Sequence, residues 1–253
     1  MNADLSLLLG LVLVHLLGDF ALQPRRWVEA RYVRKVRSPQ LYMHAALHGG
    51  LAFAVLGAAT LSHSNANGSL TMVLGGALTV AVSHMAIDLG KSYLSPSRLR
   101  WFMLDQALHL LVLLGVWLTW LGSWQPLVTF WQWLFTPPVL GIVVAYVLVT
   151  RPLSIVIALV IQRWSAEIDN PGTLIAAGAR IGMAERVLVL TLVLLDQLTA
   201  IGFLLAAKSV LRFGELRGAQ DRKLTEYVLM GTLLSVSTAM VLGLLIRIMT
   251  EGS

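Results

Sequence analysis

The stretch LSLLLGLVLVHLLGDFALQ, residues 5–23, decides the fold class. Its apolar run contains only two ionisable side chains, His15 and Asp19, and is long enough to cross a hydrocarbon core of about 30 Å as a helix. A helix satisfies each backbone group within its own segment, as a membrane span must. Similar apolar runs continue along the chain, at 5–22, 41–62, 69–94, 101–121, 138–161, 183–207 and 225–247. The sequence therefore predicts an all-α, polytopic helical membrane protein with six or seven transmembrane helices.

The composition supports this class. Apolar residues make up 57% of the 253 residues and charged residues only 13%, against about 25% in an average soluble protein. The net charge of +6 comes from basic residues at the ends of the apolar runs, where they orient spans and contact lipid headgroups. We expect membrane lipid as a partner and no nucleic acid, and the sequence leaves a homo-oligomer open. The chain has no cysteine, which excludes disulfides and thiolate ligands.

The basic stretch RRWVEARYVRKVR, residues 25–37, orients the first four spans. It carries six basic residues and one acidic residue, so the positive-inside rule places it in the cytoplasm. Trp27, Tyr32 and three valines fall near one helical face, which predicts an interfacial helix on the inner leaflet. The N-terminus is then periplasmic in a bacterial inner membrane. Because the N-terminal run carries Asp4 and lacks a basic flank, we expect a retained span and not a cleavable signal peptide.

The second half of the chain fits this rule less well. Strict alternation of the spans would place the basic connector 208–223 outside. If the run at 138–162 breaks at Arg151–Pro152 and is re-entrant, six crossings return this connector to the cytoplasm. We favour six crossings slightly, and seven stay open. We divide the chain into a four-helix membrane module at 1–122 and a set of C-terminal membrane helices at 123–253.

Each of the first four spans carries two ionisable residues spaced four positions apart, so that both lie on one helix face. The pairs are His15 and Asp19, His44 and His48, His84 and Asp88, and Asp105 and His109. All four pairs fall near the cytoplasmic boundary. We expect an outer layer of Asp19, His44, Asp88 and Asp105, with the other four residues about 6 Å deeper. Ionisable groups inside a membrane are costly and mark functional sites, so these pairs predict one shared polar site.

Imidazole and carboxylate groups together suit a divalent metal, and we expect zinc, with manganese or iron as alternatives and one or two ions. The expected core ligands are His15, His48, His84 and Asp88. Further ligands or a general base come from Asp19, His44, Asp105 and His109, with Asp19 and Asp105 as the catalytic candidates. Gln23, Lys91 and Gln106 flank the cluster and are expected to contact substrate or support the ligands. A proton relay through the same residues is the alternative chemistry.

The C-terminal half offers fewer candidates. It contains no histidine, and we expect Glu185 and Arg186 to form a structural ion pair or to contact headgroups. Asp196 falls within the run at 183–207, where an unpaired acid is costly. Arg151 is its candidate partner.

The motifs HLLGDFALQ, YMHAALHG, SHMAIDLGK and FMLDQALHL occur in this order. Together they resemble an uncharacterised bacterial membrane family, domain of unknown function 3307, most strongly over about residues 10–115. The resemblance implies a helical membrane protein and supplies no activity. The chain is also similar to membrane-bound metal-dependent hydrolases in the kind of polar site it carries, without sharing a sequence motif with them.

Three functions follow as hypotheses. The first is a metal-dependent hydrolase of a lipid or lipid-linked phosphate or ester, with its site at the cytoplasmic headgroup region. The second is a metal-ion or proton transporter or channel that uses the same cluster. The third is a non-catalytic scaffold held together by a structural metal or polar site.

Overall fold

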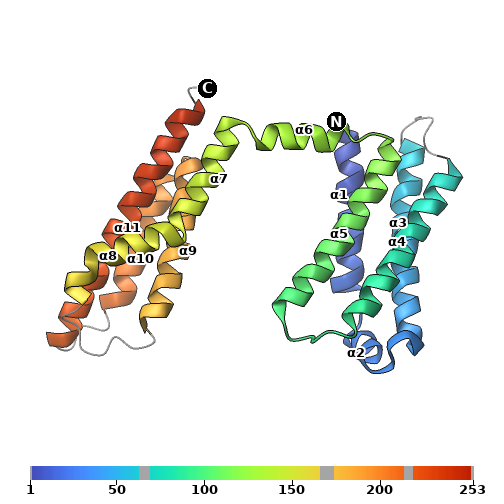
Figure 1. Cartoon of the computed structure of the whole chain (residues 1–253), viewed down its shortest axis with the longest axis horizontal. Helices are drawn as coiled ribbons and strands as arrows, with labels where there is room; N and C mark the ends of the chain where they lie inside the picture. Colours follow the sequence, from blue (N-terminus) through green and yellow to red (C-terminus); the bar gives the residue numbers. More distant parts are fainter. Residues whose placement is uncertain (1, 63–68, 166–173, 214–218, 252–253) are drawn as a thin grey trace. The chain divides into compact units, whose positions relative to one another are not determined.

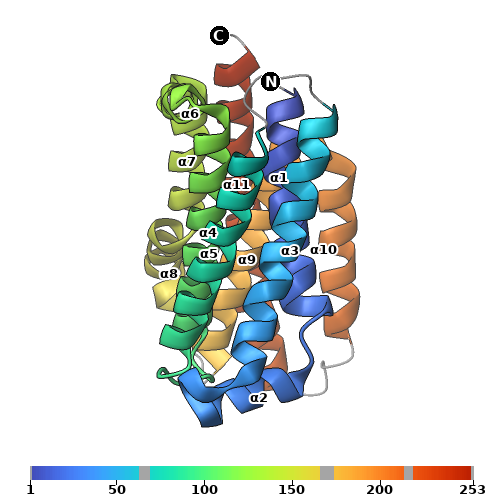
Figure 2. The same ribbon diagram turned by 90° about the vertical axis from the view of Figure 1, so that its right-hand side faces the viewer.

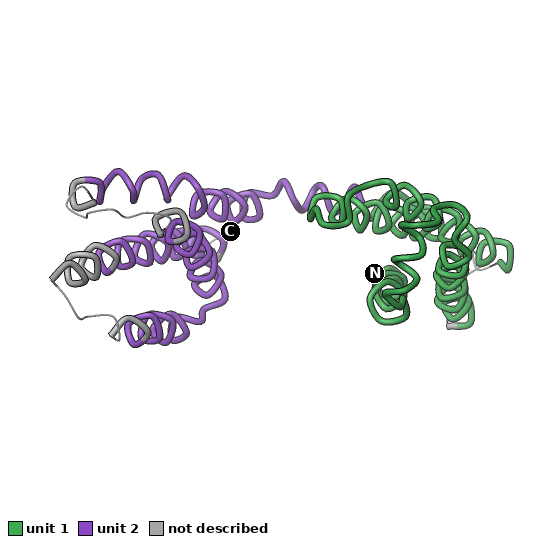
Figure 3. Tube along the Cα trace, turned by 90° about the horizontal axis from the view of Figure 1, so that it is seen from below, with its two compact units in different colours: residues 1–126 green, residues 127–253 purple. Residues whose placement is uncertain are grey.

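The computed structural model describes residues 2–62, 69–165, 174–213 and 219–251. Within these ranges the chain is helical and has no strand, which confirms the all-α prediction. Five described helices are long and apolar enough to cross a membrane, and a sixth span results if α6 and α7, bent by 63°, are counted as one. The chain is a multi-pass helical membrane protein. It folds as two compact units, residues 1–126 and 127–253 (Figure 3).

The first unit is built on four long helices. Its elements are α1 (Asn2–Leu16), the π-helix η1 (Leu17–Ala21), α2 (Arg25–Arg34), the 3-10 helix η2 (Lys35–Arg37), α3 (Pro39–Ser62), α4 (Leu70–Lys91) and α5 (Leu99–Leu121). α3 packs against α1 and α4, and α5 packs against α4 and α1. The short helix α2 lies at one end of this bundle (Figures 1 and 2).

The inward face of each long helix is an apolar stripe that ends in polar residues near α2. On α1 the buried residues are Leu7, Leu11 and His15, four positions apart, whereas Leu9 and Leu13 on the opposite face are each 58% exposed. The other three helices repeat this pattern. Their buried residues, taken toward the polar end, are Leu56, Ala52, His48 and His44 on α3; Val73, Ala77, Val80, His84 and Asp88 on α4; and Leu113, His109 and Asp105 on α5. Exposed apolar surface of this kind suits lipid. The spacing that buries the core therefore also directs the polar pairs into the bundle.

Local signals fix the helix ends. The hydroxyl of Ser69 caps α4 by accepting a hydrogen bond from the Met72 amide at 3.3 Å. α5 ends at Gly122, which has a φ of 61°, a left-handed conformation that glycine adopts without strain. At the same end of the bundle, the Trp117 indole donates to the Asp4 carbonyl at 2.6 Å and joins α5 to the start of α1.

The predicted helix at 25–37 is present as α2 and η2, and the residue that it buries is a cation. Val33 and Val36 are 80% and 49% exposed, whereas Arg31 is only 3% exposed. This helix therefore directs a cation into the protein, in addition to any apolar face it presents to a membrane surface.

The second unit contains the remaining helices. They are α6 (Gln125–Leu134, which begins at the unit boundary), α7 (Pro137–Val149), α8 (Arg151–Ser165), α9 (Leu174–Leu194), α10 (Leu198–Phe213) and α11 (Ala219–Glu251). Its buried core forms where α7, α9, α10 and α11 meet. The predicted break near Arg151–Pro152 is confirmed, since α7 ends at Val149 and α8 begins at Arg151.

Two expectations for this unit are wrong. The run at 183–207 is not one span, because α9 ends at Leu194 and α10 begins at Leu198. Asp196 lies at this break with a φ of 60° and forms an ion pair with Arg247, not with Arg151. A polar residue at a helix break does not bear the cost of an acid buried inside an apolar helix, which explains its presence in the run.

Arg186 stabilises the break between α7 and α8. Its Nε donates to the Val149 carbonyl at 2.6 Å, and its other nitrogens bond the Thr150 carbonyl and the Ser154 and Ser235 hydroxyls. These bonds satisfy carbonyl groups that the end of α7 leaves without helical partners. The expected ion pair between Glu185 and Arg186 is absent from the described part of the chain. The Glu185 carboxylate instead forms an ion pair with the Lys208 ammonium at 2.6 Å.

Two predicted loops fall partly or wholly outside the described residues. His63, predicted in an external loop, lies there. In the basic connector 208–223, α10 continues to Phe213 and α11 begins at Ala219, and the residues between them are outside the described ranges.

Candidate metal centre

The carboxylate of Asp19 lies at the centre of the polar cluster. Its Oδ1 atom is 3.1 Å from the Nε2 atoms of His44 and His48 and 3.3 Å from Nε2 of His84. Its Oδ2 atom is 3.8 Å from Nε2 of His15. One carboxylate at the end of the first span therefore contacts imidazoles from α1, α3 and α4.

A local irregularity brings Asp19 to this position. Residues 17–21 form a π-helix, in which the Leu22 amide donates to the Leu17 carbonyl at 2.9 Å. Such single π-turns inside helices occur frequently at functional sites. Gly18, within this turn, is buried against His48, and a Cβ at this position would lie 2.4 Å from Cε1 of the His48 ring. Only glycine leaves room for the ring to pack on the backbone of η1.

The five imidazoles of the bundle form one buried group. The ring of His84 stacks between those of His48 and His109, with centroid distances of 3.7 and 3.9 Å. The His15 ring lies 5.0 Å from His109 and 5.2 Å from His48, and the His44 ring lies 4.6 Å from His48. None of the five is more than 3% exposed.

Several ring nitrogens in this group have no hydrogen-bond partner. Among the described residues, buried nitrogen atoms without one are Nε2 of His15, His48, His84 and His109, and Nδ1 of His44 and His84. Nε2 of His48 is close to Asp19 but not in hydrogen-bond geometry. Buried polar atoms are rarely left unsatisfied in proteins, and each costs stability. Unpartnered imidazole nitrogens that converge in a buried site have the chemistry of metal ligands.

Three sets of side chains offer donor atoms that lie within 4.8 Å of one another. They are His15, Asp19, His48 and His84; His44, His84 and Asp88; and Asp19, Asp105 and His109. Around a tetrahedral zinc ion with bonds of about 2.1 Å, neighbouring donor atoms lie about 3.4 Å apart. The distances of 3.1 and 3.3 Å from Asp19 to His48 and His84 are close to this value. The first set has the donors of a four-coordinate site, and the other two sets share His84 or Asp19 with it.

Asp88 does not lie in one donor set with the other three expected core ligands, His15, His48 and His84. Its Oδ2 atom is 3.7 Å from both His44 Nε2 and His84 Nδ1, and it accepts a hydrogen bond from the Arg31 guanidinium. Asp19, not Asp88, lies in the set with His15, His48 and His84.

Asp105 joins the cluster to two of the flanking residues. Its Oδ2 atom accepts hydrogen bonds from the Lys91 ammonium and, at 3.2 Å, from the Gln106 amide. The same amide nitrogen of Gln106 donates to Asp19 Oδ2 at 2.9 Å. The other oxygen of Asp105, Oδ1, is buried without a hydrogen-bond partner among the described residues and lies 3.6 Å from Nε2 of His109. Gln106 thus links the carboxylates of Asp19 and Asp105.

Gln23, the third flanking residue, is half-buried just beyond η1. It forms no hydrogen bond with the described residues. The structure therefore brings ten of the eleven candidate residues into one contact network and leaves Gln23 beside it.

Arg31 is the residue of the network that sequence reasoning missed. It is buried, bonds Asp88, and leaves its Nε atom without a partner in the described part of the chain. Burial lowers the pKa of the Arg31 guanidinium below its usual range, and the nearby carboxylates of Asp105 and Asp19 oppose this effect. In the sequence it is one of six basic residues in a stretch that sets topology, and nothing distinguishes it from the other five.

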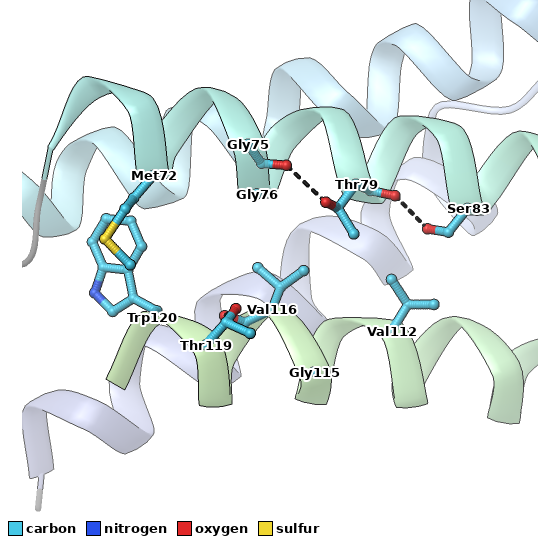
Figure 4. Close-up of a pocket in the computed structure, with 10 residues that line it drawn as sticks. All are labelled: Met72, Gly75, Gly76, Thr79, Ser83, Val112, Gly115, Val116, Thr119 and Trp120. Atoms are coloured by element: carbon cyan, nitrogen blue, oxygen red, sulfur yellow. Dashed lines mark hydrogen bonds between the residues drawn. The ribbon is translucent and has the colours of Figure 1, made fainter. Parts of the chain in front are cut away.

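A groove lies between α4 and α5 and is lined by residues of these two helices (Figure 4). It has a volume of about 440 Å³ and runs from Ser83, next to His84, toward Trp120 at the far end of α5. The Ser83 and Thr79 hydroxyls in its wall donate to backbone carbonyls of α4, at 2.6 and 2.8 Å. Three of the ten lining residues are glycines, Gly75, Gly76 and Gly115, and the lining is mostly apolar.

Comparison with known proteins gives one match. A family model described as protein of unknown function (DUF3307) matches residues 7–136, which is more than half of the chain and includes the whole cluster and Arg31. No curated protein and no solved structure matches. The resemblance found in the four motifs is confirmed, and the chain belongs to the DUF3307 family.

Proposed function

We propose that this protein is a metal-dependent hydrolase of the bacterial inner membrane, acting at the cytoplasmic headgroup region on a lipid or lipid-linked phosphate or ester. The observation that carries the proposal is the convergence on Asp19 of buried imidazoles from α1, α3 and α4, with ring nitrogens that lack hydrogen-bond partners in the described chain. Burying such groups without a ligand costs stability, and a divalent cation removes that cost.

His15, Asp19, His48 and His84 are the proposed ligands of the first ion. His44 and Asp88, or Asp105 and His109, are the donors available to a second. A divalent ion held by these residues would lower the pKa of a water bound to it and would polarise an ester or phosphoryl oxygen. Zinc is the expected metal, because imidazole and carboxylate donors in a four-membered set suit it.

Asp105 is the proposed general base. Its unpartnered Oδ1 atom accepts a proton from the attacking water, whose oxygen then bonds to the phosphorus or carbonyl carbon. The ester bond breaks and the leaving oxygen takes the proton from Asp105, giving an alcohol and a phosphate or carboxylic acid. Lys91 and Gln106, both bonded to Oδ2 of Asp105, hold this carboxylate in orientation.

The surroundings of the cluster favour hydrolysis over transport. Beyond the imidazoles, the described interior of the bundle consists of apolar side chains such as Leu11, Leu56, Val80 and Leu113. A path for ions would need polar groups or water along this length. The apolar groove between α4 and α5 suits an acyl chain, which supports a lipid substrate.

The cytoplasmic location rests on charge. Arg31 of α2 bonds Asp88 of the cluster, and α2 lies at one end of the bundle (Figure 1). Together α2 and η2 carry six of the chain's basic residues. The positive-inside rule assigns such a segment to the cytoplasm, so the site opens where phosphate and ester groups of the inner leaflet lie.

The test is an activity assay on the full-length protein in detergent or nanodiscs, purified without chelators. Lipid phosphomonoesters, phosphodiesters and carboxylic esters are supplied with zinc, manganese or iron, and released phosphate or fatty acid is measured. We expect turnover of at least one class that is abolished by a chelator and restored by metal. If protein that carries metal turns over none of the three substrate classes, the hydrolase proposal is contradicted. The metal-stabilised scaffold is then the interpretation that is left.

A further inference from the structure

The polar cluster is bordered by two cations that contact its carboxylates. Arg31, from α2, bonds Asp88, and Lys91, at the end of α4, bonds Asp105. Arg31 is almost completely buried, while the Lys91 side chain is 19% exposed. The two cations therefore contact different carboxylates of one network. Arg31 is inside the protein and Lys91 is at its border.

The charge balance of the site changes sign when metal binds. With neutral imidazoles, the three carboxylates and the two cations leave one net negative charge. One divalent ion converts this into one net positive charge, and two ions convert it into three. Excess charge in a buried site is costly unless a counter-charge accompanies it. The metal-loaded site therefore suits an anionic ligand better than a neutral ester.

Arg31 has donors available for that anion. The guanidinium offers five N–H donors in a planar fork that matches phosphate and carboxylate oxygens. One nitrogen bonds Asp88, and Nε is buried without a hydrogen-bond partner among the described residues. An orphaned donor on a buried arginine beside candidate metal ligands indicates a missing acceptor.

The position of Arg31 is supported by a second contact, made by the residue that follows α2. Lys35 donates to the carbonyl of Ser92, just beyond α4, and its ammonium lies 5.0 Å from the Tyr93 ring centroid. Lys35 adopts a φ of 53° at the end of α2, a conformation that is uncommon for residues with a side chain. This anchor holds α2 against the end of α4, so Arg31 does not depend on Asp88 alone for its placement.

We propose that Arg31 and Lys91 form an anion site that holds the phosphoryl group of the substrate against the metal ions, so that the substrate is a phosphate ester. This inference rests on the proposed function and narrows its substrate class from phosphate or carboxylic esters to phosphate esters. The phosphoryl group is carried by a membrane lipid or by a smaller phosphate ester, and the two sources share this recognition chemistry.

The test measures phosphate binding by the metal-loaded, full-length protein, with metal content determined in the same preparations. The probes are inorganic phosphate and short-chain phosphatidic acid dispersed in the same detergent, with diacylglycerol as the uncharged comparison. The variants are Arg31→Lys, which keeps the charge and loses the fork, and Lys91→Gln. Arg34→Gln, an exposed cation on the same helix, is the matched control. Arg31→Gln is avoided because Arg31 supplies the one hydrogen bond from the described residues to the Asp88 carboxylate, whereas Asp105 keeps its bond from Gln106 in Lys91→Gln.

We expect both site variants to retain the metal content of the wild type. Each should bind phosphate at least about ten-fold more weakly, since each loses charge-assisted hydrogen bonds, and Arg34→Gln should bind as the wild type does. Tighter binding of phosphatidic acid than of inorganic phosphate assigns the anion to a lipid, and equal binding assigns it to the phosphoryl group alone.

Two results would overturn the proposal, and they differ from a failure of the proposed function. If metal-loaded wild type does not bind phosphate, or if Arg31→Lys and Lys91→Gln bind it as well as wild type, the anion site is wrong while the metal centre stands. If wild type carries no metal in any preparation, the proposed function itself fails.

Discussion

Asp19 and His48 lie on different helices, and Oδ1 of the first is 3.1 Å from Nε2 of the second. The same oxygen is equally close to His44 and nearly as close to His84. A carboxylate from the end of the first span therefore organises imidazoles from the second and third spans.

Substituting Gly18→Ala should disturb the centre without removing any donor. The added Cβ would lie 2.4 Å from the His48 ring, so the ring or η1 must move. We expect a destabilisation of about 2 kcal/mol, seen as an apparent melting temperature roughly 5 °C lower, together with reduced metal content. Gly50→Ala is the control, because a Cβ there meets nothing within 4 Å. Equal behaviour of the two variants would show that the close approach of Gly18 to His48 has no role.

The positions of the polar residues on their helices could be predicted from sequence. Spacings of four residues put each pair on one face, and the inward apolar stripes of α1 and α4 continue directly into His15 and His84. The choice of central carboxylate could not be predicted. It depends on the π-turn at 17–21 and on how α1 and α3 pack at Gly18, and neither follows from a regular 3.6-residue period.

Substituting Asp105→Asn should separate turnover from metal binding. The amide keeps the size of the side chain but cannot accept a proton from water, so we expect hydrolysis to fall at least about 100-fold. The first set of ligands does not include Asp105, and its metal should be retained. Released product and metal content are measured on the same samples. Unchanged turnover would exclude Asp105 as the general base.

Substituting Arg186→Gln should destabilise the second unit and leave the metal centre unchanged. Arg186 bonds two carbonyls at the end of α7 and the hydroxyls of Ser154 and Ser235. Loss of this buried network should cost about 2 kcal/mol or more, measured by thermal unfolding. Metal content per folded chain should equal that of wild type, because the ligands all lie in the first unit. Loss of metal in this variant would show that the two units depend on each other.

The C-terminal half shows where hydropathy alone misleads. The run at 183–207 predicts one span, but α9 ends at Leu194 and Asp196 lies in the break that follows, with a left-handed φ of 60°. Its partner Arg247 comes from the last helix, a contact between residues 51 positions apart that no local pattern indicates. Arg31 was overlooked for the same reason, since its burial depends on Asp88, 57 residues away.

Metal analysis of purified protein tests the central claim most directly. The full-length chain is purified without chelators as wild type, Asp19→Asn and Asp196→Asn, and divalent metals are counted by plasma mass spectrometry. Asp196→Asn makes the same chemical change at an exposed carboxylate of the second unit. We predict about one or two divalent ions per chain in wild type and Asp196→Asn and a loss of most metal in Asp19→Asn. Wild-type protein without metal, or Asp19→Asn with a full complement, would contradict a metal centre built around Asp19.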